Sequence, residues 1–361
     1  MSQRLMKKKD RFFFLYTELA GYTLACIDRF VRSFPDTEVM LVHYPVNAEA
    51  PFLFEGNEMI RMVPKNSLNI KDLMLLVEDF SPEVLLVSGW IDKDYIAVAK
   101  AFSGKIPTVM LMDNKWEGKI KQRLAALISS FTFVRNFSHA WVPGEQQKKF
   151  AKKLGFQERN ILTGFYSADT DHFLSVGKKR KEKQTGKVPH RFIYAARYYE
   201  FKGLNELLKS FEILKAKTNT DWELWCAGTG DIVPPELDGV RHFGFVQPEK
   251  MEELMMGTSV FILPSKIEPW GVAVHEFACA GFPLLLSDQV GARESFLRDG
   301  ENGFQFEAGN VNSILQAMKK VIECTDDKLI AMGEKSVELA SKVTTVSWAE
   351  TLNGILKEYA N

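Results

Sequence analysis

Two glutamates, Glu268 and Glu276, lie eight residues apart in a segment whose composition suits a charged ligand. On a helix, eight residues separate two side chains by about 12 Å along the axis and by about 80° around it. That separation is too long for one shared acid–base step, because paired glycosidase carboxyls lie about 5–9.5 Å apart. It suits two carboxylates that contact different parts of one long ligand, one at a ribose diol and one at a sugar hydroxyl. The alternative is a helix cap and a solvent-exposed glutamate.

The residues around these glutamates predict a strand, a proline turn and a helix start. The run 262–271 contains the strand end, Pro264 and Pro269, and it places Gly271 directly before the helix. A helix start presents unpaired N–H groups and the positive end of the helix dipole, which suit a phosphate. Gly271 would let the backbone approach that ligand closely.

Two cations upstream could bind a diphosphate. Arg197 follows the predicted strand 191–195, and Lys202 stands before Gly203 where the next helix begins. A diphosphate needs its charge neutralised, which Arg and Lys side chains can do. The alternative is two unrelated surface cations. The turn 228–230 also follows a strand, but it lacks the full G-x-G-x-x-G pattern of a phosphate loop.

Short apolar runs alternate with helical patterns along the chain, which predicts two successive α/β units with parallel sheets. In the first half the predicted strands are 12–16, 39–43, 84–88, 108–112 and 139–142, and the helices are 22–34, 70–80 and 120–130. In the second half the strands are 191–195, 222–227, 259–263 and 283–287, and the helices are 204–215, 272–280, 311–324, 327–341 and 348–359. Ligands of such sheets bind beyond the carboxyl ends of the strands.

The basic run 178–187 contains no apolar residue and lies near mid-chain, so it predicts a solvated linker. A nucleic-acid or nuclear-localisation patch is the alternative. We therefore expect a first domain over 1–172, a basic linker over 173–189, a second domain over 190–344 and a C-terminal helix over 345–361.

The composition narrows the class of protein. The chain of 361 residues has 46 Lys and Arg against 46 Asp and Glu, which argues against a dedicated nucleic-acid partner. Its four cysteines, Cys26, Cys226, Cys279 and Cys324, form no C-x-x-C pair, so we expect reduced thiols rather than a zinc site or a disulfide framework. No apolar run reaches the roughly 20 residues that cross a bilayer, and no signal peptide is recognisable, so we expect a cytoplasmic protein.

The ordered motifs of residues 190–310 resemble the family 4 glycosyltransferases of the GT-B fold, whose signature is two glutamates with seven residues between them. The rest of the chain matches only in layout. The resemblance implies an α/β fold of two facing Rossmann-like domains, with a C-terminal helix that packs back on the first domain. The matching residues are 196–197, 202–203, 227–230, 243–245, 263–265, 268–271, Glu276, Gly281 and 302–304.

The resemblance also implies sugar transfer with retention of configuration, from a UDP- or GDP-sugar donor, without a metal or another cofactor. Arg197 and Lys202 would hold the leaving diphosphate and stabilise its developing charge. Glu268 would hold the donor sugar and act in catalysis with these two cations, while Glu276 would hold the ribose. The other implied donor-binding residues are Gly21, Gly228, Phe245, Val246, Ser265, Trp270, Gly271 and Val272.

The first domain departs from the family pattern. The turn after its first strand lacks a Gly-Gly pair, so only Gly21 could approach a phosphate or a sugar. Asp113 stands about where relatives carry a histidine near the anomeric carbon, and we expect it to be the polar catalytic residue there. The alternative for Asp113 is a helix N-cap.

Two further features have competing interpretations. Asp169-Thr170-Asp171 reads D-x-D, a pattern that holds a divalent metal in the other large glycosyltransferase fold. We favour a turn or helix cap, so no metal site is expected. His275, beside Glu276, is as consistent with a packed helical histidine as with a ligand contact.

A basic helical segment in the first domain is consistent with membrane contact. Its cations could bind anionic headgroups while its apolar side chains enter the lipid. The alternative is a helix that packs its apolar stripe into the domain. The cations are Lys115, Lys119, Lys121 and Arg123, and the apolar residues are Ile120, Leu124, Leu127 and Ile128.

We therefore expect a retaining hexosyltransferase that moves a sugar from a nucleotide-diphosphate sugar to a glycan or lipid-linked acceptor, in cell-surface polysaccharide synthesis. We expect it in the cytoplasm, and a peripheral contact with the inner face of the cell membrane is consistent with the sequence. Two alternatives stay open: a non-catalytic sugar-nucleotide binder or scaffold, and a sugar-nucleotide epimerase of the same fold.

Overall fold

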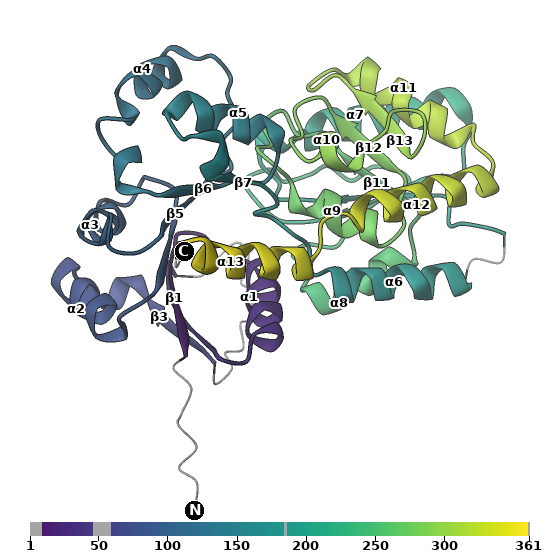
Figure 1. Cartoon of the computed structure of the whole chain (residues 1–361). Helices are drawn as coiled ribbons and strands as arrows, with labels where there is room; N and C mark the ends of the chain where they lie inside the picture. The colour runs from purple at the N-terminus through teal and green to yellow at the C-terminus, as the bar shows by residue number, and fades with distance from the viewer. Residues whose placement is uncertain (1–8, 46–58, 184–185, 360–361) are drawn as a thin grey trace, which may run out of the picture. The chain divides into compact units, whose positions relative to one another are not determined.

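The computed structural model describes residues 9–45, 59–183 and 186–359, which fall into two compact units (Figure 1). Unit 1 contains the described residues up to Ser167 and from Thr345 onward, and unit 2 contains those from Ala168 to Thr344. Each unit is built around its own parallel β-sheet. The prediction of two Rossmann-like α/β units is therefore confirmed.

Unit 1 has a seven-stranded sheet in the order β3-β2-β1-β4-β5-β6-β7, and all its pairings are parallel. The strands are β1 (Asp10–Tyr16), β2 (Thr37–His43), β3 (Ile60–Pro64), β4 (Val84–Ser88), β5 (Thr108–Leu111), β6 (His139–Trp141) and β7 (Ile161–Leu162). The helices are α1 (Gly21–Ser33), α2 (Ile70–Phe80), α3 (Lys93–Phe102), α4 (Ile120–Ser129), α5 (Glu145–Leu154) and α13 (Thr345–Tyr359), with 3-10 turns η1 (Lys65–Ser67), η2 (Val134–Asn136) and η3 (Glu158–Asn160).

Consecutive residues of β1 supply the cores on both faces of this sheet. Phe13 and Leu15 join the core formed with α2, α3 and α5, while Phe12 and Phe14 join the core formed with α1 and α13. All four side chains are fully buried. Burial of each such side chain stabilises the fold by about 1.5–3 kcal/mol. This double burial explains why the strands read as apolar runs without alternation.

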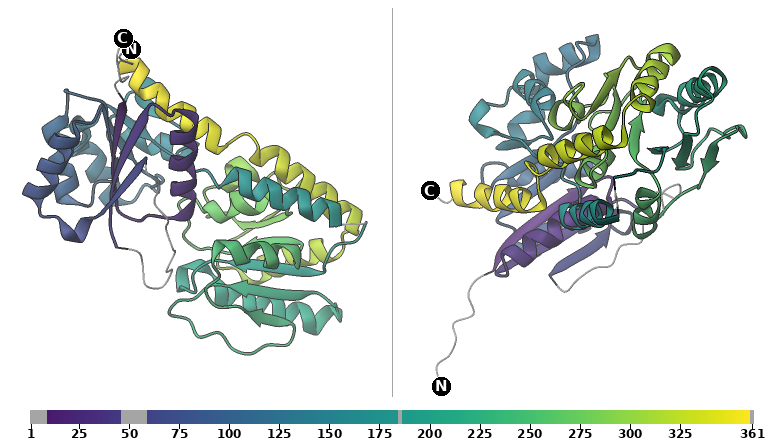
Figure 2. Two further views of the ribbon diagram at one scale, coloured as in Figure 1. Left: turned by 90° about the horizontal axis from the view of Figure 1, so that it is seen from below. Right: turned by 90° about the vertical axis from the view of Figure 1, so that its right-hand side faces the viewer.

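The C-terminal helix α13 belongs to unit 1 and lies beside α1 (Figure 2). Its Trp348 ring stacks on Phe14 at 6.5 Å between centroids and lies 4.8 Å from the Trp141 ring. The indole Nε1 of Trp348 donates a hydrogen bond of 2.8 Å to the carbonyl of Phe165. The prediction that the last helix packs back on the first unit is confirmed.

Unit 2 has a six-stranded parallel sheet in the order β10-β9-β8-β11-β12-β13. Its strands are β8 (Arg191–Ala195), β9 (Glu223–Ala227), β10 (Val240–His242), β11 (Val260–Leu263), β12 (Leu284–Ser287) and β13 (Gly303–Phe306). Its helices are α6 (Thr170–Lys183), α7 (Leu204–Thr218), α8 (Pro248–Met256), α9 (Val272–Cys279), α10 (Arg293–Phe296), α11 (Val311–Ile322) and α12 (Asp326–Ala340), with the 3-10 turn η4 (Glu200–Lys202).

Each sheet reverses its strand order beside its first strand. In unit 1 this switch point lies between β1 and β4, and in unit 2 it lies between β8 and β11. Connections leave a switch point in opposite directions, which opens a crevice at the carboxyl ends of the two strands. Ligands of parallel sheets bind in that crevice, so the topology defines where to look for a site in each unit.

The structure corrects the predicted linker over 173–189. Residues up to Lys183 belong to α6, whose Phe173 and Val176 are buried in unit 2. Gly177 lies so close to α9 that an added Cβ would be 2.7 Å from the carbonyl oxygen of Cys279. The apolar residues of this helix precede its basic run. The side chains of the basic run are mainly exposed, so the run alone gives no sign that it belongs to a packed helix. Unit 2 accordingly begins at Ala168 rather than at residue 190.

The cysteines and the helices bear on two further expectations, reduced thiols and the lack of a membrane-spanning segment. All four cysteines are free thiols, and three of them are buried. In the described ranges, no helix combines the length and the apolar character that a bilayer crossing requires.

Candidate functional site

Most of the predicted site residues follow the carboxyl ends of four adjacent strands in unit 2. Because these strands are parallel, their carboxyl ends lie at one edge of the sheet. Arg197 follows β8, Gly228 follows β9, Phe245 and Val246 follow β10, and Ser265, Glu268, Trp270 and Gly271 follow β11, while Val272 and Glu276 lie in α9.

Lys202 and Glu268 form an ion pair at the switch point of unit 2. The Nζ of Lys202 lies 2.5 Å from Oε2 of Glu268, and the Ser265 hydroxyl donates a hydrogen bond of 3.2 Å to the same oxygen. The two charged side chains are only 17% and 10% exposed. Among the described residues, Oε1 of Glu268 has no hydrogen-bond partner, so it can accept a hydrogen bond from a ligand.

Backbone contacts hold the two loops of this pair together. Lys266 N–H donates a hydrogen bond of 2.8 Å to the carbonyl of Phe201. Gly203 has φ of 74°, and a Cβ added to it would lie 2.3 Å from the carbonyl oxygen of Pro264. Only glycine fits both that conformation and that approach. The glycine after Lys202 is therefore what brings its loop against the loop that carries Glu268.

Gly271 is the N-cap of α9, with φ of 94° and no side-chain cap for the helix. A Cβ added to Gly271 would lie 3.1 Å from Cγ of Glu268. The sequence prediction of a helix start at Gly271 is confirmed. The first N–H groups of this helix follow Glu268 by only a few residues in the chain, and such groups favour a negative charge.

The glycine turn after β9 is explained by the protein's own backbone. A Cβ added to Gly228 would lie 1.9 Å from the carbonyl oxygen of Ala196. The amide of Gly228 donates a hydrogen bond of 2.8 Å to the carbonyl of Gly244, which places half-buried Phe245 and Val246 next to the turn. Gly228 is thus required for the approach of three neighbouring strand ends, whether or not a phosphate binds there.

Glu276 lies in α9 and is partly buried. Burial raises the pKa of its carboxyl from 4.5 to about 7, and the charge of Asp169 adds to this shift. A carboxyl with a pKa near 7 changes its charge close to neutral pH. Its ability to accept hydrogen bonds from a diol on both oxygens therefore depends on pH in that range.

His275 is a structural histidine. It is fully buried, its Nδ1 accepts a hydrogen bond of 2.9 Å from the amide of Ala168, and its Nε2 donates one of 3.1 Å to the carbonyl of Ala340. Its ring stacks on Phe296 at 4.4 Å between centroids. Burial lowers its pKa to about 4, so the ring is neutral. Of the two interpretations that the sequence left open, the packed histidine is the one observed.

The D-x-D run 169–171 forms a helix cap. Oδ1 of Asp169 accepts a hydrogen bond of 3.2 Å from the amide of His172, at the start of α6. This agrees with the interpretation favoured from the sequence. Within the parts of the chain that the structure describes, no three His, Cys, Asp or Glu side chains are arranged to hold a metal ion.

Arg197 and Trp270 flank the pair at the same strand ends. Arg197 has a half-buried side chain, and its carbonyl accepts a hydrogen bond of 3.0 Å from the Tyr194 hydroxyl. Trp270 is only 4% exposed, and its indole Nε1 is buried without a hydrogen-bond partner among the described residues. A buried N–H without a hydrogen-bond partner lowers the stability of the folded state by about 1–3 kcal/mol, so such groups are rare in proteins.

The switch point of unit 1 contains a pair of hydroxyl groups in place of the ion pair of unit 2. The Thr17 and Ser88 hydroxyls, which follow β1 and end β4, lie 2.9 Å apart. Gly21 is the first residue of α1, and no atom lies within 4 Å of a Cβ added to it. The sequence analysis named Gly21 but missed Thr17 and Ser88. Polar residues directly at the ends of two apolar runs were the signal that could have identified them.

Asp113 lies two residues after β5 and is half-buried. The Tyr166 hydroxyl donates a hydrogen bond of 3.3 Å to its Oδ2. The next helix begins only at Ile120, with Lys119 as N-cap, so the alternative of Asp113 as a helix cap is wrong. Burial raises the pKa of Tyr166, and the Asp113 charge adds to this shift. Tyr166, which the sequence analysis missed, keeps its proton and orients Asp113.

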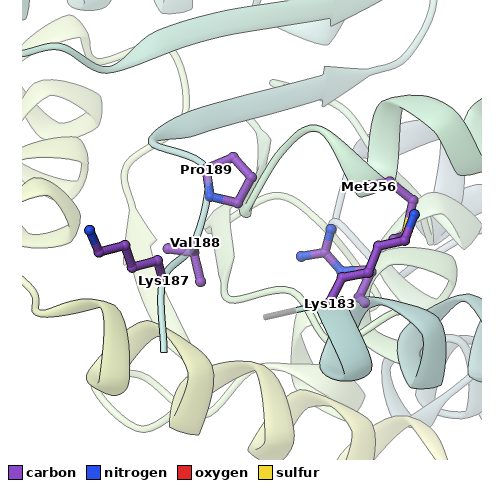
Figure 3. A pocket seen from close by; sticks show the side chains of 6 residues that line it. Lys183, Lys187, Val188, Pro189 and Met256 are labelled. Carbon is purple, nitrogen blue, oxygen red and sulfur yellow. The ribbon is translucent and has the colours of Figure 1, made fainter. Parts of the chain in front are cut away.

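A cavity in unit 2, of about 320 Å³, is lined by Arg180, Lys183, Lys187, Val188, Pro189 and Met256, and by none of the predicted site residues (Figure 3). Arg180 is a structural cation: it lies 3.6 Å above the centre of the Phe282 ring and donates a hydrogen bond of 2.8 Å to the carbonyl of Thr258. Burial lowers its pKa to about 9. Arg180 thus ties α6 to the end of α8.

The family described as "Glycosyl transferases group 1" has a sequence model that matches residues 175–338 of the chain. All of these residues lie in unit 2, and they include the Lys202–Glu268 pair and Glu276. The chain is 27% identical over 157 residues to an uncharacterized glycosyltransferase of Methanocaldococcus jannaschii, covering 41% of this chain and 38% of that protein. It is 24% identical over 224 residues to a glycogen synthase of Exiguobacterium sibiricum, covering 51% of this chain and 45% of that protein. It therefore spans less than half the length of these curated relatives.

Solved structures resemble the whole chain. A glycosyltransferase from Rickettsia africae has a TM-score of 0.71 at 11% identity, covering 98% of this chain and 99% of that one. Anabaena Alr3699/HepE, solved in complex with UDP and glucose, has a TM-score of 0.72 at 13% identity, covering 97% and 99%. Identities this low establish the fold alone. The GT-B fold expected from the sequence motifs is confirmed.

Proposed function

We propose that the chain, whose residues 175–338 match the sequence model of the group 1 glycosyltransferases, is a retaining hexosyltransferase. It takes a hexose from a nucleotide-diphosphate sugar and transfers it to a glycan or lipid-linked acceptor. The donor binds at the strand ends of unit 2.

The observation that carries this proposal is the cluster of Lys202, Glu268 and Ser265 at the switch point of unit 2. It combines a cation suited to a diphosphate with a carboxylate suited to sugar hydroxyls, at the edge where parallel sheets bind ligands. The ammonium group of Lys202 has three N–H donors, and Glu268 uses one of them. The others can bind a phosphate without breaking the ion pair.

The departure of the diphosphate is the step that these cations serve. When the bond between the anomeric carbon and the diphosphate oxygen breaks, the oxygen keeps the electron pair and its negative charge grows. Lys202 and Arg197 stabilise that charge more than the charge of the bound donor, which lowers the barrier. With the uncapped start of α9, they neutralise the diphosphate, and we propose that no metal is required.

The rest of the donor extends along the same edge. Glu268 binds a hydroxyl of the donor sugar through Oε1, together with the backbone at Trp270 and Gly271. Glu276 accepts hydrogen bonds from the ribose diol, and Phe245 and Val246 line the pocket for the base. Gly228, Ser265 and Val272 complete the contacts through their positions at the strand ends and the helix start.

Unit 1 contributes two of the proposed site residues. Asp113 is the polar catalytic residue near the anomeric carbon, and Gly21 lets the backbone of the first turn approach the donor. The pathway we propose is cell-surface polysaccharide synthesis, in the cytoplasm or at the inner face of the cell membrane. Neither nucleic acid nor a resident cofactor takes part.

A panel of nucleotide sugars tests the donor assignment by thermal shift. UDP-glucose is the first probe because Anabaena Alr3699/HepE was solved with UDP-glucose, and GDP-mannose is the second. A donor at 100 times its dissociation constant stabilises the folded protein by about 2.7 kcal/mol. We expect one donor to raise the melting temperature of the wild type and to do so much less in Glu276→Ala. A panel without any shift would contradict the proposal.

A non-catalytic sugar-nucleotide binder is the second candidate, favoured by one observation: the first turn of unit 1 offers a single glycine, Gly21, to an approaching donor. Slow hydrolysis of the donor distinguishes the two functions. We expect the wild type to release the nucleoside diphosphate from the donor that gives the thermal shift. Arg197→Ala should reduce that turnover more than donor affinity. Binding without any turnover, in the presence of glycan and lipid-linked acceptors, would favour the binder.

A further inference from the structure

Six of the ten residues of helix α4 are exposed. Of its ten residues only Ser129 is buried. Large apolar side chains of this helix and of the residues after it face solvent, although such side chains usually form a core. Their exposed fractions are 77% for Ile120, 59% for Leu124, 71% for Leu127, 58% for Ile128 and 77% for Phe131.

These five side chains form one stripe, which we call the α4 apolar face. Ile120, Leu124, Leu127 and Ile128 follow the i, i+4, i+7, i+8 spacing that places residues on one side of a helix, and Phe131 lies in the turn just after the helix. The structure therefore overturns the alternative in which this stripe packs into the domain: on the described residues of unit 1, nothing covers it. Single exposed apolar residues are common, but a contiguous stripe marks a surface that binds something.

Basic residues surround the α4 apolar face. Between Lys115 and Lys153 the chain has nine Lys and Arg but only two Asp and Glu, although the whole chain is neutral. Helix α5, which lies beside α4 at the edge of unit 1 (Figure 1), adds exposed lysines to those of α4. Lys121, Arg123, Lys149 and Lys153 form no ion pair with any described residue.

We propose that the α4 apolar face and its surrounding cations dock unit 1 on an anionic lipid bilayer. The apolar side chains enter the boundary between headgroups and acyl chains, and the basic side chains bind the negative headgroups. A second copy of the chain is a poorer occupant, because two such faces would bring like charges together. The docking itself does not depend on the proposed sugar transfer. Its role, which is to bring the enzyme to a lipid-linked acceptor, rests on the proposed function.

Vesicle sedimentation with the full chain tests the docking. One vesicle is pure phosphatidylcholine, and the other contains about one third phosphatidylglycerol, so that only the charge differs. We expect binding to the anionic vesicle to exceed binding to the neutral one and to weaken when the salt is raised from about 0.1 M to 1 M. Lys121→Gln/Arg123→Gln should weaken binding about 30-fold, since each basic residue near an anionic surface contributes about a factor of five.

Matched variants separate a specific face from general exposure. Leu124→Gln/Leu127→Gln should weaken vesicle binding at least about tenfold. Leu75→Gln on α2, where the leucine is 57% exposed, should leave it unchanged. Lys209→Gln/Lys217→Gln on α7 removes two exposed lysines of unit 2 and is the control for charge. The donor-induced thermal shift of every variant reports whether it is folded and whether the donor site works.

Three results would overturn the docking proposal. One is a wild type that binds neither vesicle, and another is equal loss of binding in Leu75→Gln and Leu124→Gln/Leu127→Gln. The third is a dimer in sedimentation equilibrium without lipid that Leu124→Gln/Leu127→Gln dissociates, which would assign the face to a second copy. A wild type that binds anionic vesicles but no nucleotide sugar would leave the docking intact and contradict the proposed function instead.

Discussion

The carboxyl-terminal edges of the two sheets differ in the contacts that hold their loops in place. At the switch point of unit 2, Gly203 contacts the backbone of Pro264 and Lys202 pairs with Glu268. At the switch point of unit 1, Thr17 and Ser88 share a hydroxyl hydrogen bond and Gly21 has open space around it. The first switch point contains a packed ion pair, whereas the second contains a hydroxyl pair and leaves open space at Gly21.

This difference separates two reasons for a glycine. Gly203 and Gly228 are needed by the protein's own backbone, since an added Cβ would meet a carbonyl oxygen at 2.3 Å and 1.9 Å. Gly21 meets no such atom, so packing gives no reason for a glycine there. A pattern of glycines at strand ends therefore mixes folding requirements with ligand approach, and only the structure separates them.

The largest expected effect is that of Gly203→Ala, which should destabilise the protein by about 3–5 kcal/mol, because it combines strain at positive φ with a backbone clash. Gly21→Ala is the matched variant and should change stability by less than about 1 kcal/mol. Urea unfolding measures both. Equal stability losses would show that the two edges do not differ in packing.

The next effect concerns catalysis at the strand ends of unit 1. Asp113→Asn should reduce kcat about 100-fold, the lower end of the range for a positioned polar catalyst, while the melting temperature stays near that of the wild type. Tyr166→Phe removes the hydrogen bond of 3.3 Å to Asp113 and should have a smaller effect of the same kind. Wild-type turnover in Asp113→Asn would remove this residue from the mechanism.

A double-mutant cycle tests the ion pair at the switch point of unit 2. Lys202→Ala leaves Glu268 unpaired in surroundings where it is only 10% exposed, and it should cost about 2 kcal/mol of stability, below the value for a fully buried pair. The double variant Lys202→Ala/Glu268→Gln should lose less than the sum of the single variants, because the unpaired charge is gone. Additive losses in urea unfolding would mean that the pair does not stabilise the edge.

The smallest expected effect is a dependence on pH through Glu276. Its pKa is raised from 4.5 to about 7, so between these values the folded protein holds a proton that the unfolded chain has released. Stability therefore falls as pH rises through this window. Glu276→Gln removes that loss, and its melting temperature should exceed that of the wild type by about 2–4 °C at pH 8 and by almost nothing at pH 4.5.

Glu212→Gln, at an exposed position of α7, is the control and should show no such trend. Donor affinity should change in the opposite sense to stability, rising with pH as the Glu276 carboxylate forms. A melting temperature of Glu276→Gln that tracks the wild type at every pH would refute the raised pKa.

The elements of the fold were predictable wherever burial dictates the residue types. The strands over 84–88 and 191–195 and the helix over 70–80 have the predicted bounds, because a strand between two helical layers must be apolar throughout. Strand β3 and helices α3 and α5 were not assigned from the sequence. Val98 is the only branched aliphatic residue among the three buried positions of α3, and α5 has six Lys or Gln among its ten residues, so their patterns were weak.

The sequence by itself determined the α/β alternation, the strand ends that could contain a site and the motifs 196–203 and 265–276 that fall there. Tertiary structure alone decided that Lys202 pairs with Glu268 across 66 positions and that Gly228 contacts Ala196. It alone decided that the basic run after Phe173 continues a packed helix and that the α4 apolar face is uncovered. The physical reason is the same in each case: a local pattern fixes which side of an element is apolar or charged, but its partner comes from distant chain.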